Sequence, residues 1–168
     1  MLVDAVVLLL FPCLMAFAAS SDFFTMTISN RVSLALAAGF LVLAPAVGMG
    51  IAEIGMHVAA AGTILTATFC MFALGWIGGG DAKLAAATAL WLGFDQLLPY
   101  LLLASILGGG LTLLILQARV FPLPRALQGA GWAERLHRKD GGIPYGIALA
   151  AAALVVYPDT IWMHAVSI

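Results

Sequence analysis

The chain has 168 residues, of which 64% are hydrophobic and only 9% are charged, and its formal net charge is −1. Soluble domains carry roughly 25% charged residues, so this composition excludes a soluble globular protein. The length allows several membrane spans with short loops, as one domain over residues 1–168 without a separate soluble domain. We therefore expect an all-α, polytopic membrane protein that is surrounded by the lipid bilayer and binds no nucleic acid.

Six apolar runs predict six transmembrane helices, at about residues 2–20, 32–51, 54–77, 82–94, 97–118 and 143–164. Most match the ~20 residues that cross a hydrocarbon core of ~30 Å. The first run carries Asp4 and no preceding Lys or Arg, so we interpret it as a retained helix and not as a signal peptide. The fourth run is short. It spans the bilayer only if the Gly79–Asp81 segment before it also lies within the membrane.

The basic residues predict the orientation of these helices. Under a six-helix topology they all fall on one face, namely Arg31, Lys83, Arg119, Arg125, Arg135, Arg138 and Lys139. Because cytoplasmic loops are enriched in lysine and arginine, that face should be cytoplasmic, with both termini on the non-cytoplasmic side. The long cytoplasmic loop then covers about residues 119–142. Within it, Trp132 and Leu136 are four residues apart, which indicates a short interfacial helix with an aromatic anchor.

Three consecutive glycines, Gly78, Gly79 and Gly80, precede Asp81 and Lys83 between two apolar runs. An ionisable side chain at membrane depth is expensive and marks a candidate functional site. Because glycine is a poor helix former, we expect the three glycines to form a turn that lets a substrate backbone come close. The alternative is a plain connecting turn in which Lys83 marks the cytoplasmic side.

Asp22 ends the first apolar run on the same predicted face and is therefore the best partner for Asp81. Two close carboxylates do not both ionise easily, so one keeps a proton. Aspartic proteases use such a pair, in which the carboxylate activates water and the acid protonates the scissile carbonyl. Asp140 and Glu134 are rival partners, but both lie in the basic loop, where a solvated loop charge is the better interpretation.

The two cysteines, Cys13 and Cys70, lie in separate apolar runs and form no Cys-x-x-Cys pair. We therefore expect neither a disulfide framework nor a zinc site. No metal and no other cofactor is expected.

Three stretches carry a resemblance to the aspartic type IV prepilin peptidases. The run Gly78-Gly79-Gly80-Asp81-Ala82-Lys83-Leu84 resembles their Gly-x-Gly-Asp motif. Asp22, with Ile28 and Asn30, is similar to their first aspartate motif. The run Gly142-Ile143-Pro144-Tyr145-Gly146-Ile147-Ala148 resembles the stretch that opens their last helix. Two departures are visible: Ser29 occupies the place of the usual proline, and Phe23, Phe24 and Met26 stand where basic or polar residues are frequent.

The resemblance implies a membrane-embedded aspartic endopeptidase of the bacterial inner membrane. Such an enzyme cleaves the leader of a prepilin or pseudopilin at the cytoplasmic face, serves the pilus assembly machinery, and would use Asp22 and Asp81 as its dyad. Gly78 to Gly80, Lys83 and Asn30 would support or position the substrate. Without paired Cys-x-x-Cys motifs, the chain is similar to the short, peptidase-only type of Flp (tight adherence) pili, and N-methylation is not expected.

Other functions remain open at this point. One is a Gly-x-Gly-Asp protease that cuts within other transmembrane segments. Another is a small proton- or cation-coupled transporter subunit that uses the same aspartates near glycine-broken helices. A third is an assembly factor without catalysis, in which both aspartates should tolerate replacement by asparagine.

Overall fold

The computed structural model describes residues 2–166, and every regular element in that range is helical. The longer helices are α1 (Leu2–Thr25), α2 (Asn30–Ala46), α3 (Ile51–Ala73), α4 (Gly79–Leu92), α5 (Leu97–Ala118) and α7 (Tyr145–Val156). The shorter ones are η1 (Arg125–Leu127), α6 (Gly131–His137), η2 (Tyr157–Asp159) and α8 (Ile161–Val166). The all-α prediction is therefore confirmed.

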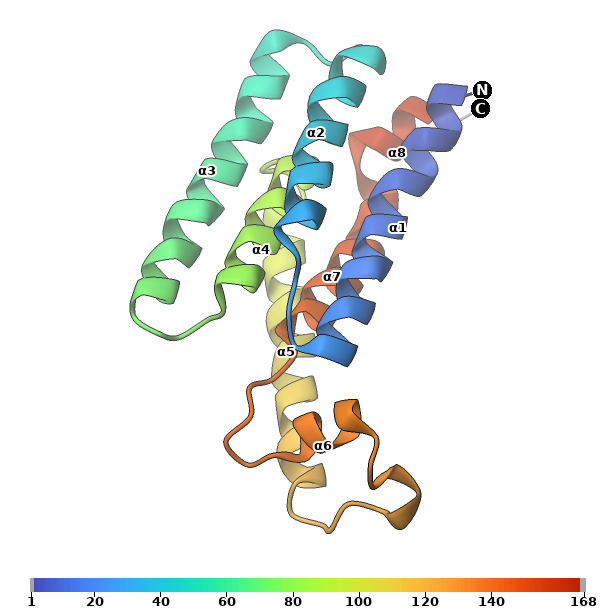
Figure 1. Cartoon of the computed structure of the whole chain (residues 1–168). Helices are drawn as coiled ribbons and strands as arrows, with labels where there is room; N and C mark the ends of the chain where they lie inside the picture. The colour runs from blue at the N-terminus through green and yellow to red at the C-terminus, as the bar shows by residue number, and fades with distance from the viewer. Residues whose placement is uncertain (1, 167–168) are drawn as a thin grey trace.

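Three helices of the described chain are long and apolar enough to cross a membrane, namely Asp4–Thr25, Ile51–Ala73 and Leu97–Ala118. Shorter apolar helices cover Asn30–Ala46 and Tyr145–Asp159. In Figure 1, the start of α1 and the helix α8 lie at one end of the bundle, and the loop that contains α6 lies at the other. The number of spans and their orientation in the bilayer remain predictions.

The last apolar run, predicted as one helix over residues 143–164, is broken in the structure. It divides into α7, the 3-10 turn η2 and α8. Pro158 lies in the first turn of η2, and Thr160 after it is extended, with φ −93° and ψ 160°. Because proline has no N–H and a fixed φ, it interrupts a continuing α-helix. Hydropathy alone does not register this break.

Helix α4 is the centre of the bundle and packs against α3, α2 and α7. Its residues from Leu84 to Leu92 are all buried. A helix that is apolar on every side belongs in a protein interior, and the alanines of α4 let its neighbours approach closely. The short fourth run is therefore explained by its central position, because α4 is covered by other helices.

Aromatic residues fix the far end of α4. Trp91 and Trp162 are fully buried and lie 4.5 Å apart between ring centroids. The Trp91 Nε1–H donates to the Leu36 carbonyl of α2 at 2.9 Å, and the Trp162 Nε1–H donates to the Trp91 carbonyl at 2.7 Å. Both indole N–H groups thus have the partner that burial requires. These bonds hold α4 in register with α2 and α8.

The glycine run before Asp81 does not form the expected turn. The left-handed residue is Gly75, with φ 76°, whereas Gly78 is the extended N-cap of α4 and Gly79 and Gly80 form its first turn. The first turn of α4 requires glycine because it leaves little room for side chains. A Cβ added at Gly80 would lie 3.2 Å from the Cβ of Ile28, tighter than an ordinary contact. The glycines therefore serve close packing, and not unusual backbone angles.

Candidate active site

Asp81 is the third residue of α4 and is partly buried. The backbone N–H of Gly78, the N-cap, hydrogen-bonds its carboxyl group, and a Cβ added at Gly78 would lie only 2.9 Å from Asp81 Oδ2. An acidic residue at this position receives a free N–H of the first turn and the positive end of the helix dipole. The start of α4 therefore holds the Asp81 carboxyl group in place.

Asp22 lies in the last turn of α1 and is only 5% exposed. Its Oδ2 accepts a hydrogen bond of 2.7 Å from the backbone N–H of Gly146, in the first turn of α7. The first N–H groups of a helix have no partner within it, so Asp22 satisfies one of them from another helix. Pro144, the N-cap of α7, is fully buried beside this contact.

The structure brings Asp22 and Asp81 into one site. The charge of Asp22 acts electrostatically on Asp81. Ile28 packs between the two helix starts: a Cβ at Gly80 would meet its Cβ at 3.2 Å, and a Cβ at Gly146 would meet its Cδ1 at 2.6 Å. The end of α1 and the starts of α4 and α7 therefore meet around Ile28.

The loop after Asp22 is closed by local interactions. Met26 adopts a left-handed conformation, with φ 56°, and its N–H donates to the Asp22 carbonyl at 2.8 Å, which ends α1. Ser29 is the N-cap of α2, and its hydroxyl accepts from the Arg31 N–H at 3.3 Å. Serine is a favoured N-cap, so the residue that replaces the usual proline starts α2 by a different means.

Lys83 and Asn30 are also brought together, on a different face of α4 from Asp81. The Lys83 Nζ donates to Asn30 Oδ1 at 2.9 Å. Since residues two apart on a helix point in nearly opposite directions, Lys83 faces α2 while Asp81 faces the α1 side. The predicted role of this pair in positioning substrate stays a prediction.

The rival carboxylates have other partners in the loop. Asp140 is exposed and forms an ion pair of 2.7 Å with Arg138, and the Arg138 hydrogen bond holds the pKa of Asp140 below its usual range. Glu134 Oε1 accepts from the Gly129 N–H at 2.8 Å. Neither of them joins Asp22 and Asp81.

Arg119 connects the end of α5 to the chain that leads into α7. It is only 7% exposed, and its guanidinium donates to three backbone carbonyls, those of Leu136 at 2.7 Å, Gly141 at 3.0 Å and Gly142 at 2.8 Å. The planar fork of arginine suits several simultaneous acceptors. Arg119 thereby fixes the segment that ends at the Gly146 N–H, and so the place of Asp22.

The loop between α5 and α7 folds onto the end of α1. The predicted short helix is confirmed as α6, and its Trp132 lies 5.2 Å from Phe23 and 6.3 Å from Phe24 between ring centroids. Arg135 donates from its guanidinium to the Phe24 carbonyl. The two phenylalanines that depart from the family pattern therefore anchor the loop beside Asp22.

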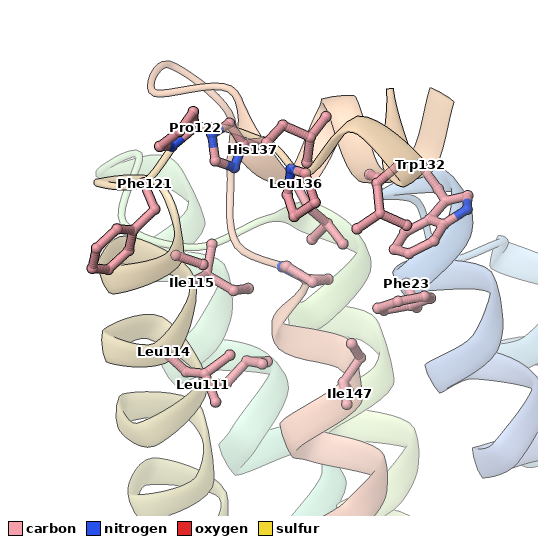
Figure 2. Close-up of a pocket in the computed structure, with 16 residues that line it drawn as sticks. Phe23, Leu111, Leu114, Ile115, Phe121, Pro122, Trp132, Leu136, His137 and Ile147 are labelled. Atoms are coloured by element: carbon pink, nitrogen blue, oxygen red, sulfur yellow. The ribbon is translucent and has the colours of Figure 1, made fainter. Parts of the chain in front are cut away.

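An apolar pocket of about 450 Å³ lies beneath this loop. Figure 2 shows Trp132, Leu136 and His137 on its loop side, with Phe23 of α1 opposite Trp132 and Ile147 of α7 below them. Phe23 and Ile147 directly follow Asp22 and Gly146 in the sequence. The pocket therefore adjoins the candidate site on the side of the loop.

Sequence reasoning missed Gly146 and Arg119 as parts of the site. The run from Gly142 to Ala148 carried a signal for the first, because it matched a family stretch, but a backbone N–H leaves no side-chain pattern to interpret. From the sequence, Arg119 is interpreted only as a topology-setting charge. It lies at the end of an apolar run, and a charge that is buried there needs partners. That position is the signal that could have predicted its contacts with the chain before α7.

The model of the type IV leader peptidase family matches residues 9–113, a range that contains both aspartates. No curated protein and no solved structure matches the chain. Because the family match covers more than half of its length, the chain belongs to the type IV leader peptidase family.

Proposed function

We propose that this protein is a membrane-embedded aspartic endopeptidase in which Asp22 and Asp81 form the catalytic dyad. Membership of the type IV leader peptidase family makes it a protease, and the family implies prepilin substrates. The observation that supports the catalytic assignment is that a carboxyl group from the end of α1 and one from the start of α4 lie close enough to interact electrostatically, and that each accepts a hydrogen bond from a backbone N–H.

The dyad shares one proton, because two adjacent carboxylates do not both ionise easily. The ionised member takes a proton from water, whose oxygen attacks the scissile carbonyl carbon while the protonated member donates to the carbonyl oxygen. The diol then collapses, the C–N bond breaks, and a proton passes to the leaving nitrogen. The N–H groups of Gly146 and Gly78 keep both carboxyl groups oriented through these steps.

The substrate is the leader of an Flp-type prepilin, cut at the cytoplasmic face of the bacterial inner membrane. Support comes from the charge distribution: Arg125, Arg135, Arg138 and Lys139 are all in the loop at the Asp22 end of the bundle (Figure 1). By the positive-inside rule that end is cytoplasmic. Gly78 is exposed beside Asp81, which leaves an approach for an extended peptide.

The test is co-expression with a prepilin, followed by the ratio of processed to unprocessed pilin for Asp22→Asn and Asp81→Asn. We expect neither variant to process the prepilin at normal membrane levels. Asp140→Asn is the matched control, since it removes a carboxylate of the same loop region that is exposed and paired with Arg138. Full processing by either dyad variant would refute the proposal.

A further inference from the structure

An apolar groove lies between α2 and α3, with α4 as its floor. In Figure 1, α2 and α3 join at one end and separate toward the other, and α4 lies between them. The groove has a volume of about 710 Å³. Its walls are exposed apolar side chains such as Leu34 and Leu41 of α2 and Leu65 of α3, and its floor is Ala86 and Ala87 of α4.

The polar groups of this groove gather at one end. Asn30, Ser33 and Lys83 are its polar lining residues, and they lie near the starts of α2 and α4. The Ser33 hydroxyl oxygen is buried and has no hydrogen-bond partner within residues 2–166. Over the same range the Lys83 ammonium bonds only Asn30 and pairs with no carboxylate. Since an ammonium has three donors, this end of the groove has unused capacity for oxygen acceptors.

The polar end of the groove and the candidate active site share the first turns of α4. Lys83 follows Asp81 by two residues, so the two side chains leave opposite faces of the same turn of α4. Phe72 and Ile28 pack against Gly79 and Gly80 in that turn, whereas Gly78 before it is exposed. An extended backbone that begins at Lys83 therefore reaches Asp81 by way of Gly78, around the N-terminal end of α4.

We propose that the groove binds the apolar membrane helix of the prepilin, with the start of that helix at Lys83 and Asn30. This inference rests on the proposed function. The alanine floor allows a helix to approach closely, as small residues do in membrane interfaces. The extended segment before the helix has carbonyl oxygens without helical partners, and the exposed Lys83 donates to them on the way to the dyad. Bound lipid is the competing occupant.

Gly62→Phe tests the groove. Gly62 lines it, and a Cβ added there meets nothing within 4 Å, so the ring enters the groove without disturbing the fold. Gly110→Phe on α5 is the matched control, because its Cβ also meets nothing within 4 Å and it lies outside the groove. Each purified protein in liposomes is given two substrates: the full prepilin, and a short peptide that carries the leader and scissile segment without the helix.

We expect Gly62→Phe to raise KM for the full prepilin roughly tenfold or more at an unchanged kcat, as loss of uniform binding does. Its cleavage of the short peptide should equal that of the wild type, and Gly110→Phe should change neither. An unchanged KM for the prepilin would overturn the inference, and the proposed function would still stand. Equal slowing on both substrates would also overturn it and indicate a lipid or fold effect. Failure of the wild type to cleave either substrate would instead refute the proposed function.

Discussion

Replacing Gly146 by alanine should damage catalysis while the fold survives. A Cβ at this position would lie 2.8 Å from Asp22 Oδ2 and 2.6 Å from Ile28 Cδ1, both closer than real Cβ contacts come. Both neighbours are ends of side chains, so they can move. Asp22 Oδ2 must retreat by about half an ångström to reach the 3.4 Å at which ordinary contact begins. The Ile28 shift is harmless, whereas the Asp22 shift strains its hydrogen bond from the Gly146 N–H.

The size of the expected decrease in kcat follows from the strength of the hydrogen bond between the Gly146 N–H and Asp22. A hydrogen bond to a charged group contributes about 1.5–3 kcal/mol, and each 1.36 kcal/mol of barrier is a factor of about ten in rate. If the loss falls on the transition state, kcat should decrease roughly 10- to 100-fold. The change to alanine favours helix by up to about 1 kcal/mol, which offsets part of the cost of the strained contacts, so the protein should stay folded at the assay temperature.

The assay is kcat and KM for prepilin cleavage by purified protein in liposomes, with the unfolding midpoint measured in parallel. Gly110→Ala is the control, since a Cβ there meets nothing within 4 Å, and we expect wild-type kcat from it. A wild-type kcat from Gly146→Ala would refute the reasoning that the Gly146 N–H orients Asp22.

Three further outcomes are expected. Arg119→Lys should lower kcat about tenfold with KM little changed, because an ammonium cannot reproduce the fork that holds three carbonyls and a small displacement of catalytic groups is costly; wild-type kinetics would contradict this. Trp91→Phe removes the indole N–H that donates to the Leu36 carbonyl and should lower the free energy of unfolding by about 1–3 kcal/mol, seen as a lower thermal midpoint, with kcat per folded molecule retained. Asp140→Asn should lower the thermal midpoint slightly above about pH 4 and leave it unchanged well below that pH, because a carboxylate whose folded-state pKa is lowered stabilises the protein only while it is ionised; a pH titration of the midpoint for both proteins checks this.

The positions of the two aspartates could be predicted because charge is rare in this chain. Basic residues on one predicted face and helix-end carboxylates on the same face selected Asp22 and Asp81 among the acidic residues. The structure reports their proximity, and their catalytic roles remain proposals. The short helix α6 was predictable for a similar reason, since Trp132 and Leu136 share one face of a helix within a basic loop.

Features that depend on backbone groups and tertiary contacts could not be predicted from the sequence pattern. The glycine run suggested a turn, yet tertiary packing against Ile28 places Gly79 and Gly80 in the first turn of α4. The hydropathy pattern predicted one continuous helix, whereas the helix is interrupted after α7 at Pro158. The link from Arg119 to Gly142 joins two segments that are adjacent only in the folded chain. These features depend on the folded chain around them, which the local sequence pattern does not describe.

The central claim is that Asp22 and Asp81 act as one catalytic unit, and a double-mutant cycle tests it most directly. The measurement is the rate of prepilin cleavage by purified wild type, Asp22→Asn, Asp81→Asn and the double variant, with the new N-terminus identified by mass spectrometry. Residues that act as a unit are strongly non-additive, so each single variant should fall to the same residual rate as the double variant. A single variant that cleaves at the wild-type rate, or losses that multiply in the double variant, would contradict the claim.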